Sequence, residues 1–168
     1  MTVQFTERNK VVGVMAPVDN TTNAITCKPV NFDYYNRVAY IVYPGTVGSS
    51  TPTLTVYKGT SAADALSSGS ALTFTYRIAS AGTGPTTGAG SYSVMDGSVA
   101  TAASLALTSD RLLVIEVLAS DCGKAYPWTC VRVSAAGNND TLAVIAVCFD
   151  ARYAQDSIVS VSGQPSPI

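Results

Sequence analysis

Four cysteines carry the most reactive side chains of this chain of 168 residues: Cys27, Cys122, Cys130 and Cys148. A zinc site needs thiolates or imidazoles in close pairs, typically with about two to four residues between the two members. Seven residues separate Cys122 from Cys130, and the chain contains no histidine. The spacing therefore does not predict a zinc knuckle, and the sequence indicates no metal and no cofactor.

The redox state of these cysteines stays open at the level of sequence. Cys122 and Cys130 could form a disulfide that closes the loop between them, or a bridge between subunits. Reduced thiols are the expected state of a protein made in a cytosol. Cys148 lies in the apolar run LAVIAVCF, which is typical of a buried cysteine that packs as a small hydrophobic residue.

The remaining polar residues do not match the common patterns of catalytic sites. Without histidine the chain has no imidazole base and no Ser–His nucleophile pair. The eleven acidic residues lie mostly at predicted turns or strand ends, where Asp caps local backbone groups. No serine lies in the Gly-x-Ser-x-Gly pattern of a nucleophile elbow. We therefore expect a protein that is not an enzyme.

The composition points to contacts with other proteins. Charged residues make up 12% of the chain, about half the usual fraction of about 25%. A surface with so few charges is typical of one covered by partners, although a small Thr/Ser-rich β-protein can also be weakly charged. The net charge is −1 and no basic stripe is present, which argues against nucleic-acid binding. Neither a signal peptide nor a membrane span is indicated.

The elements that position these residues are predicted to be short strands. Residues 72–78 alternate strictly, with Leu72, Phe74, Tyr76 and Ile78 on one face and polar residues on the other. Residues 61–66 are the best candidate for a short helix, and residues 82–90 form a Gly-rich loop without the Gly-Lys-Ser/Thr ending of a phosphate loop. The other expected strands cover 11–16, 25–30, 37–43, 53–57, 91–95, 111–118, 128–134 and 141–149, with a short apolar piece at 105–107.

This pattern predicts an all-β fold, an antiparallel β-sandwich of jelly-roll type with an extended N-terminal arm. We expect an arm over residues 1–10, one domain over 11–162 and a tail over 163–168. Residues 111–118 and 141–149 are apolar on both faces, which is typical of central strands in a sheet covered on both sides. Glu116 and Arg132 interrupt apolar faces, and we expect a cross-strand ion pair between them, or a contact to a partner.

Three residues on a predicted connection are candidate contact residues: Lys124, Tyr126 and Trp128. Exposed Tyr and Trp can anchor a protein interface or stack on a ligand, and Pro127 would stiffen the loop. The alternative is that Trp128 begins a strand and packs at the end of the core.

Two segments in particular, residues 31–45 (NFDYYNRVAYIVYPG) and 54–65 (LTVYKGTSAADA), followed by 131–137 and 142–147, resemble small structural proteins of tailed bacteriophages, especially those that decorate or cement the head. The resemblance implies a virion protein made in the bacterial cytoplasm. It also implies binding of the major capsid protein outside the expanded head, as a homo-oligomer with a trimer favoured. The contact candidates in the arm, the Gly-rich loop and the tail are then Val3, Phe5, Arg8, Thr83, Pro85 and Pro165.

Two other functions remain open from the sequence. The chain could belong to the tail, the neck or a receptor-binding spike of the same kind of particle. It could also be a carbohydrate-binding β-sandwich that uses Trp128 and the residues before it.

Overall fold

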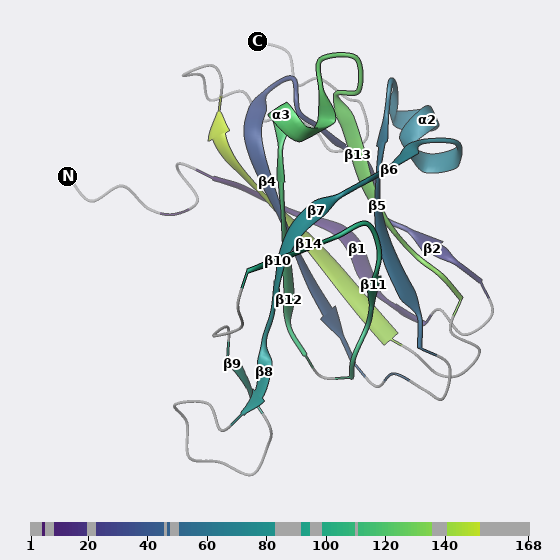
Figure 1. The fold of residues 1–168 in the computed structure, drawn as a ribbon, viewed down its shortest axis with the longest axis vertical. Coiled ribbons are helices and arrows are strands. Elements are labelled where there is room, and N and C mark those ends of the chain that lie inside the picture. Colours follow the sequence, from purple (N-terminus) through teal and green to yellow (C-terminus); the bar gives the residue numbers. More distant parts are fainter. Residues whose placement is uncertain are drawn as a thin grey trace.

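The computed structural model places two antiparallel sheets face to face (Figure 1). It describes residues 5, 9–19, 23–45, 47, 51–82, 92–94, 99–109, 111–135 and 141–151. The antiparallel β-sandwich predicted from the sequence is confirmed.

The first sheet has six strands, of which β14 and β1 run from the left side of Figure 1 across its centre. In spatial order they are β1 (Lys10–Asp19), β14 (Thr141–Ala151), β4 (Tyr35–Pro44), β12 (Leu113–Leu118), β7 (Phe74–Ile78) and β10 (Ala100–Ala102). The two long apolar segments of the sequence, β12 and β14, are internal strands of this sheet, as expected.

The second sheet is built around β5 and β13. Its order is β11 (Leu105–Ala106), β5 (Thr53–Gly59), β13 (Trp128–Val133) and β2 (Ile25–Thr26), with β3 (Val30–Asn31) on β13 and β6 (Ser70–Leu72) on β5. A separate two-stranded ribbon, β8 (Ser80–Gly82) and β9 (Tyr92–Val94), extends below the sandwich in Figure 1. Two short helices, α2 (Ala62–Ser67) and α3 (Ala119–Cys122), complete the described elements.

The core lies between the sheets and follows the period-two alternation of the strands. On β12, Leu113, Ile115 and Val117 are buried in the core, while the residues between them face outward. On β13, Val131 and Val133 point into the same core from the other side. Buried apolar area of this kind is the main stabilising contribution to a sandwich.

The helix expected over 61–66 is present as α2, and its start has a clear local cause. The Ser61 hydroxyl accepts a hydrogen bond from the Asp64 backbone N–H at 3.1 Å, which caps the first turn. Asp64 in turn accepts a hydrogen bond from the Thr60 backbone N–H at 2.8 Å. The helix packs on the outer face of the second sheet, against β5 and β13.

Several elements differ from the sequence prediction. Residues 72–78 are not one strand: Leu72 ends β6 on the second sheet, and Phe74 begins β7 on the first, so the chain changes sheets at Thr73. The strands β8 and β10 and the helix α3 were not predicted, and the strand expected over residues 25–30 is two short strands, β2 and β3. The boundary at residue 11 lies next to the start of β1 at Lys10, whereas the tail over 163–168 lies outside the described residues.

The expected ion pair between Glu116 and Arg132 is wrong, because the two strands belong to different sheets. Glu116 lies on β12 of the first sheet, beside Ala39 and Thr75. The Arg132 guanidinium lies 4.0 Å from the centroid of the Tyr57 ring, and its Nη2 donates to the Ala65 carbonyl at 2.6 Å.

Candidate functional site

The connection between β12 and β13 forms an exposed loop at the upper end of the sandwich in Figure 1. We call residues 119–127 the end loop; it consists of α3 and the five residues that follow it. Gly123 ends the helix with φ +79°, a left-handed conformation that favours glycine, and its N–H donates to the Ala119 carbonyl at 3.2 Å. The loop therefore carries the chain from the first sheet to the second.

Lys58 of β5 supports the end loop from beneath. Its Nζ donates to the backbone carbonyls of Asp121 at 3.3 Å and Cys122 at 3.0 Å, where α3 leaves carbonyl groups without a helical partner. The same ammonium lies 5.1 Å from the centroid of the Tyr126 ring, within the range of a cation–π contact. One cation thus fixes both the end of α3 and the ring that follows it.

Backbone hydrogen bonds hold the rest of the loop. The Tyr126 N–H donates to the Gly123 carbonyl at 3.0 Å, and the Phe32 N–H donates to the Pro127 carbonyl at 2.7 Å. The second bond ties the loop to residues 31–35, which lie about ninety positions earlier in the chain and meet it because β3 pairs with β13. The end loop is therefore attached to the sandwich at both ends.

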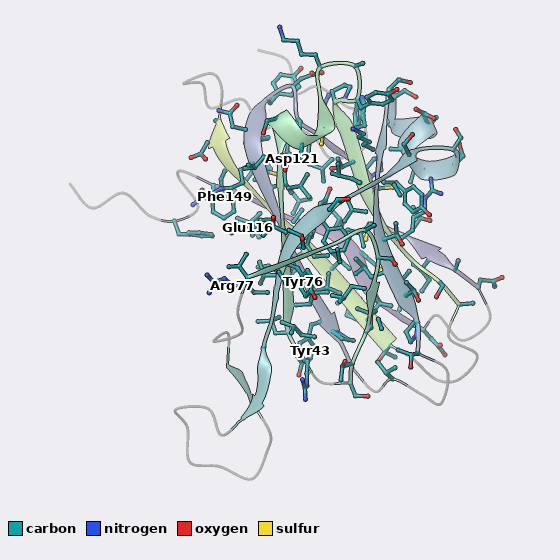
Figure 2. The ribbon with its side chains drawn as sticks, in the orientation of Figure 1. Tyr43, Tyr76, Arg77, Glu116, Asp121 and Phe149 are labelled. Carbon is teal, nitrogen blue, oxygen red and sulfur yellow. The ribbon has the colours of Figure 1, made fainter. Side chains whose placement is uncertain are left out.

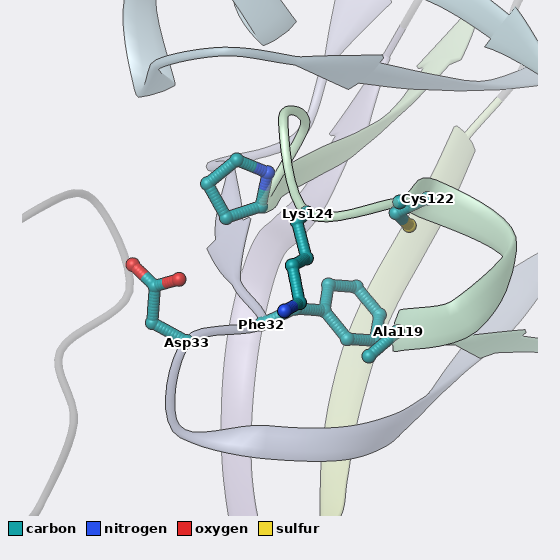
Figure 3. Close-up of a pocket in the computed structure, with 7 residues that line it drawn as sticks. Phe32, Asp33, Ala119, Cys122 and Lys124 are labelled. Carbon is teal, nitrogen blue, oxygen red and sulfur yellow. The ribbon is translucent and has the colours of Figure 1, made fainter.

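A hollow of about 310 Å³ lies between the end loop and the turn after β3. Its lining combines an apolar floor with one cation and one carboxylate: Phe32, Asp33, Ala119, Cys122, Gly123, Lys124 and Pro127. Figure 3 shows the Lys124 side chain extending from the loop toward Phe32, with the carboxyl group of Asp33 to one side. The hollow is a place where a side chain of a partner could be received between opposite charges.

The structure separates the three contact candidates of this region. Lys124 is exposed at the tip of the end loop, and Tyr126 is half-buried against Lys58. Trp128 is the first residue of β13, is half-buried, and pairs with Asn31 and Gly59. Trp128 is therefore a strand residue, which is the alternative that the sequence left open.

Of the other contact candidates, Phe5 lies among the residues that the structure describes, and its side chain is 57% exposed. The Phe5 carbonyl accepts hydrogen bonds from the backbone N–H and the side-chain amide nitrogen of Asn9. The remaining candidates lie outside the described residues: Val3, Arg8, Thr83, Pro85 and Pro165.

All four cysteines are free and buried, so the disulfide between Cys122 and Cys130 is not formed in this structure. The reason is geometric. Cys122 points into the core between the sheets, whereas Cys130 faces the opposite side of β13, where its Sγ donates to the Ala65 carbonyl of α2 at 2.8 Å. Alternation along β13 puts Thr129 and Val131 on the core side and Cys130 on the outer side.

Burial raises the pKa of Cys122 and of Cys148 to about 12. It raises the pKa of Cys27 and of Cys130 as well. These thiols are therefore protonated near neutral pH, and a protonated thiol is a poor nucleophile and a poor metal ligand.

Asp64 has a lowered pKa, caused first by the hydrogen bond from the Ser68 hydroxyl and then by the one from the Thr60 backbone. These partners stabilise α2, so the carboxylate has a structural role.

Within the part of the chain that the structure describes, no group of three or more Cys, Asp or Glu residues is arranged to hold a metal ion. Among the described helices, none is long and apolar enough to cross a membrane.

Sequence reasoning missed Lys58, Phe32 and Asp33 as members of this site. Their positions depend on the pairing of β3 and β5 with β13, and no local pattern near residue 124 indicates those partners. Phe32 and Asp33 do fall within the segment 31–45 that resembles phage structural proteins, which is the only sequence signal that covers them.

Comparison with known proteins gives one structural similarity. No family model matches the chain, and no curated protein matches it. The crystal structure of SPBc2 prophage-derived protein YomS is similar with a TM-score of 0.44 and 12% sequence identity, over 83% of this chain and 92% of that one.

Proposed function

We propose that this chain is a structural protein of a tailed-phage particle, which binds the outer surface of the capsid and stabilises the expanded head. The kind of particle is inferred from the sequence resemblance of residues 31–45 and 54–65. The structure supports a protein that acts by surface contact, through the end loop.

The observation that carries this proposal is the support of the end loop. Lys124 is exposed at the tip, while Lys58 and the bond from Phe32 to Pro127 hold the backbone beneath it. A loop that is already fixed before binding loses little conformational entropy in the complex. The hollow beside it offers Lys124 and Asp33 as two opposite charges for orienting a partner.

The cysteines also support a structural role. A catalytic cysteine needs a lowered pKa and access to substrate, whereas all four thiols here are buried and have raised pKa values.

Stabilisation of the head follows from differential binding. A protein that binds the expanded lattice more tightly than the compact one shifts the capsid toward the expanded form by the difference in binding free energy. Such a protein needs no conformational change of its own, which agrees with a sandwich whose contact loop is held in place.

The test is co-sedimentation of the purified chain with expanded and with compact empty capsids of the phage that encodes it. We expect binding to the expanded capsids, with an affinity lowered about tenfold by Lys124→Glu, equivalent to about 1.4 kcal/mol. Lys28→Glu makes the same charge change at an exposed residue outside the end loop and is the matched control. Equal binding to both capsid forms, or no binding to either, contradicts the proposal.

The carbohydrate-binding alternative uses Trp128 and the residues before it. Trp128 is half-buried in β13, and no specific observation favours a sugar site there, so we do not propose that function. A role in the tail or neck would share the same contact chemistry, and its test is the location and number of copies in the particle.

A further inference from the structure

The outer face of the first sheet carries a concentration of exposed apolar side chains. Four of them are Val11 on β1, Ile145 on β14, Tyr43 on β4 and Leu118 on β12, with exposed fractions of 44%, 42%, 49% and 44%. The register places all four on the face away from the core. On the second sheet the outer face carries α2, whereas α3, the described helix that contacts β12 and β4 of the first sheet, lies at their upper end in Figure 1.

The centre of this face is continuous across strands. Ile145, Ile41 and Val114 stand side by side on β14, β4 and β12, and all three face outward. The next row along the strands contains Val147 of β14 and Ala39 of β4, which are only 4% and 5% exposed, and the exposed Glu116 of β12. We call the outward-facing residues of β1, β14, β4, β12 and β7 the open face.

Two opposite charges lie on the open face in adjacent rows. Arg77 of β7 is opposite Val114, and Glu116 of β12 is opposite Thr75, so the two side chains are diagonal neighbours. They line a groove of about 280 Å³ together with Val99 and Val114. Figure 2 shows Phe149, Glu116 and Arg77 along one side of the molecule.

Besides Arg77 and Glu116, the open face carries Asp19 at the end of β1, opposite Thr141, and the pair Arg37 and Asp150. The Arg37 Nε and the Asp150 Oδ2 lie 3.8 Å apart, and the Arg37 guanidinium also lies 4.7 Å from the centroid of the Phe149 ring. By contrast, Arg77 and Glu116 have no ion pair or side-chain hydrogen bond with any residue that the structure describes. The face therefore offers one unpaired cation and one unpaired anion on an apolar background.

We propose that the open face binds the same face of a second copy of this chain. The twofold axis lies in the plane of contact and runs across the strands, between the row that contains Val114 and the row that contains Glu116. It places Glu116 of each copy near Arg77 of the other copy. Two ion pairs then form at once, and the apolar rows of Ile41 and Ile145 are covered. A strongly acidic or strongly basic partner would satisfy only one of the two charges, whereas a second copy satisfies both.

The geometry of such a pair is that of ordinary sheet packing. Sheets that pack face to face keep their strands within about 30° of each other and lie about 10 Å apart. The end loop lies at the end of the sandwich rather than on the open face, so it stays accessible in the pair. A twofold contact can also coexist with the threefold assembly expected from the sequence, as a hexamer.

The test measures self-association in solution, without capsids, so its outcome is independent of the proposed function. Sedimentation equilibrium of the full chain is expected to give a mass that is an even multiple of the monomer. Arg77→Glu alone and Glu116→Arg alone each place like charges together and are expected to weaken the association at least about tenfold. Lys28→Glu is the control for the charge change and is expected to leave the mass unaltered.

The decisive sample is an equimolar mixture of the Arg77→Glu and Glu116→Arg chains. In a twofold pair of one chain of each kind, both contacts are again between opposite charges, so association is expected to return in the mixture. The double variant Arg77→Glu/Glu116→Arg is expected to self-associate like the original chain. A monomeric original chain, or single variants that associate as well as it does, would overturn the proposal. The proposal would also be overturned if neither the mixture nor the double variant regained self-association.

Discussion

The hydroxyl oxygen of Tyr40 on β4 lies 2.7 Å from Oγ1 of Thr129 on β13, and this buried hydrogen bond joins the two sheets across the core. Tyr40 and Thr129 are both fully buried, and burial raises the pKa of Tyr40 well above its usual value, so the hydroxyl stays protonated. Because each buried hydroxyl satisfies the other, the pair fixes how the sheets stand relative to each other.

Removing one hydroxyl of this pair is expected to lower the free energy of unfolding more than removing both hydroxyls. Tyr40→Phe leaves the Thr129 hydroxyl without its partner, and we expect the free energy of unfolding to fall by about 1–2 kcal/mol. Thr129→Val is expected to cost less, because the Thr129 backbone carbonyl, 3.4 Å from the Tyr40 hydroxyl, remains as an acceptor. Urea denaturation of the double variant measures the coupling, and losses that simply add would show that the two hydroxyls act independently.

Gly59 is expected to be intolerant of any side chain. A Cβ at this position would lie 2.3 Å from the Ala65 backbone nitrogen, so α2 would have to move away from β5. We expect Gly59→Ala to lower the free energy of unfolding by about 1–3 kcal/mol. Gly13→Ala on β1 is the control, because nothing lies within 4 Å of its added Cβ, and equal effects of the two substitutions on the melting temperature would refute this account of α2.

Lys58 is expected to control the rigidity of the end loop. Lys58→Met keeps most of the aliphatic chain but removes the donors to the Asp121 and Cys122 carbonyls. We expect faster amide hydrogen exchange at residues 123–126, with little change in the β-sheet amides. Lys124→Met is the matched control at the exposed tip, and the same exchange rates in both variants would contradict a supporting role for Lys58.

The buried thiols predict a loss of stability at alkaline pH. The pKa of Cys148 is raised by burial from 9.0 to about 12 in the folded chain, so above pH 9.0 the unfolded chain loses a proton that the folded chain keeps. Stability is therefore full below pH 9.0 and declines as pH rises toward about 12. Urea midpoints measured across this range should fall less steeply for Cys148→Ala than for the original chain, and an equal slope would contradict the assignment.

Much of the fold could be predicted from local pattern, because strand alternation and turn residues are local properties. The change of sheets at Thr73 could not, since Leu72 and Phe74 are both buried and the alternation is the same for one strand as for two. Cys130 faces outward from β13 and is nevertheless buried, because α2 covers the second sheet there, and no local pattern predicts that cover. Lys124 could be identified as an exposed loop residue, whereas Lys58 beneath it required the pairing of β5 with β13.

What covers the open face could not be predicted from the sequence either. The apolar character of residues 111–118 and 141–149 on both faces indicated that something covers their outer side. The sequence alone could not distinguish a loop of this chain from a neighbour. Only the register brings Arg77 and Glu116 together on that face and gives its partner a charge pattern.

Quantitative peptide counting on purified particles tests the central claim most directly. The account predicts that this chain is present in fixed proportion to the major capsid protein, and that heads purified without tails retain the same proportion. Absence of the chain from the particles would contradict a structural role in the virion. A small copy number that is lost with the tail would contradict binding to the capsid surface.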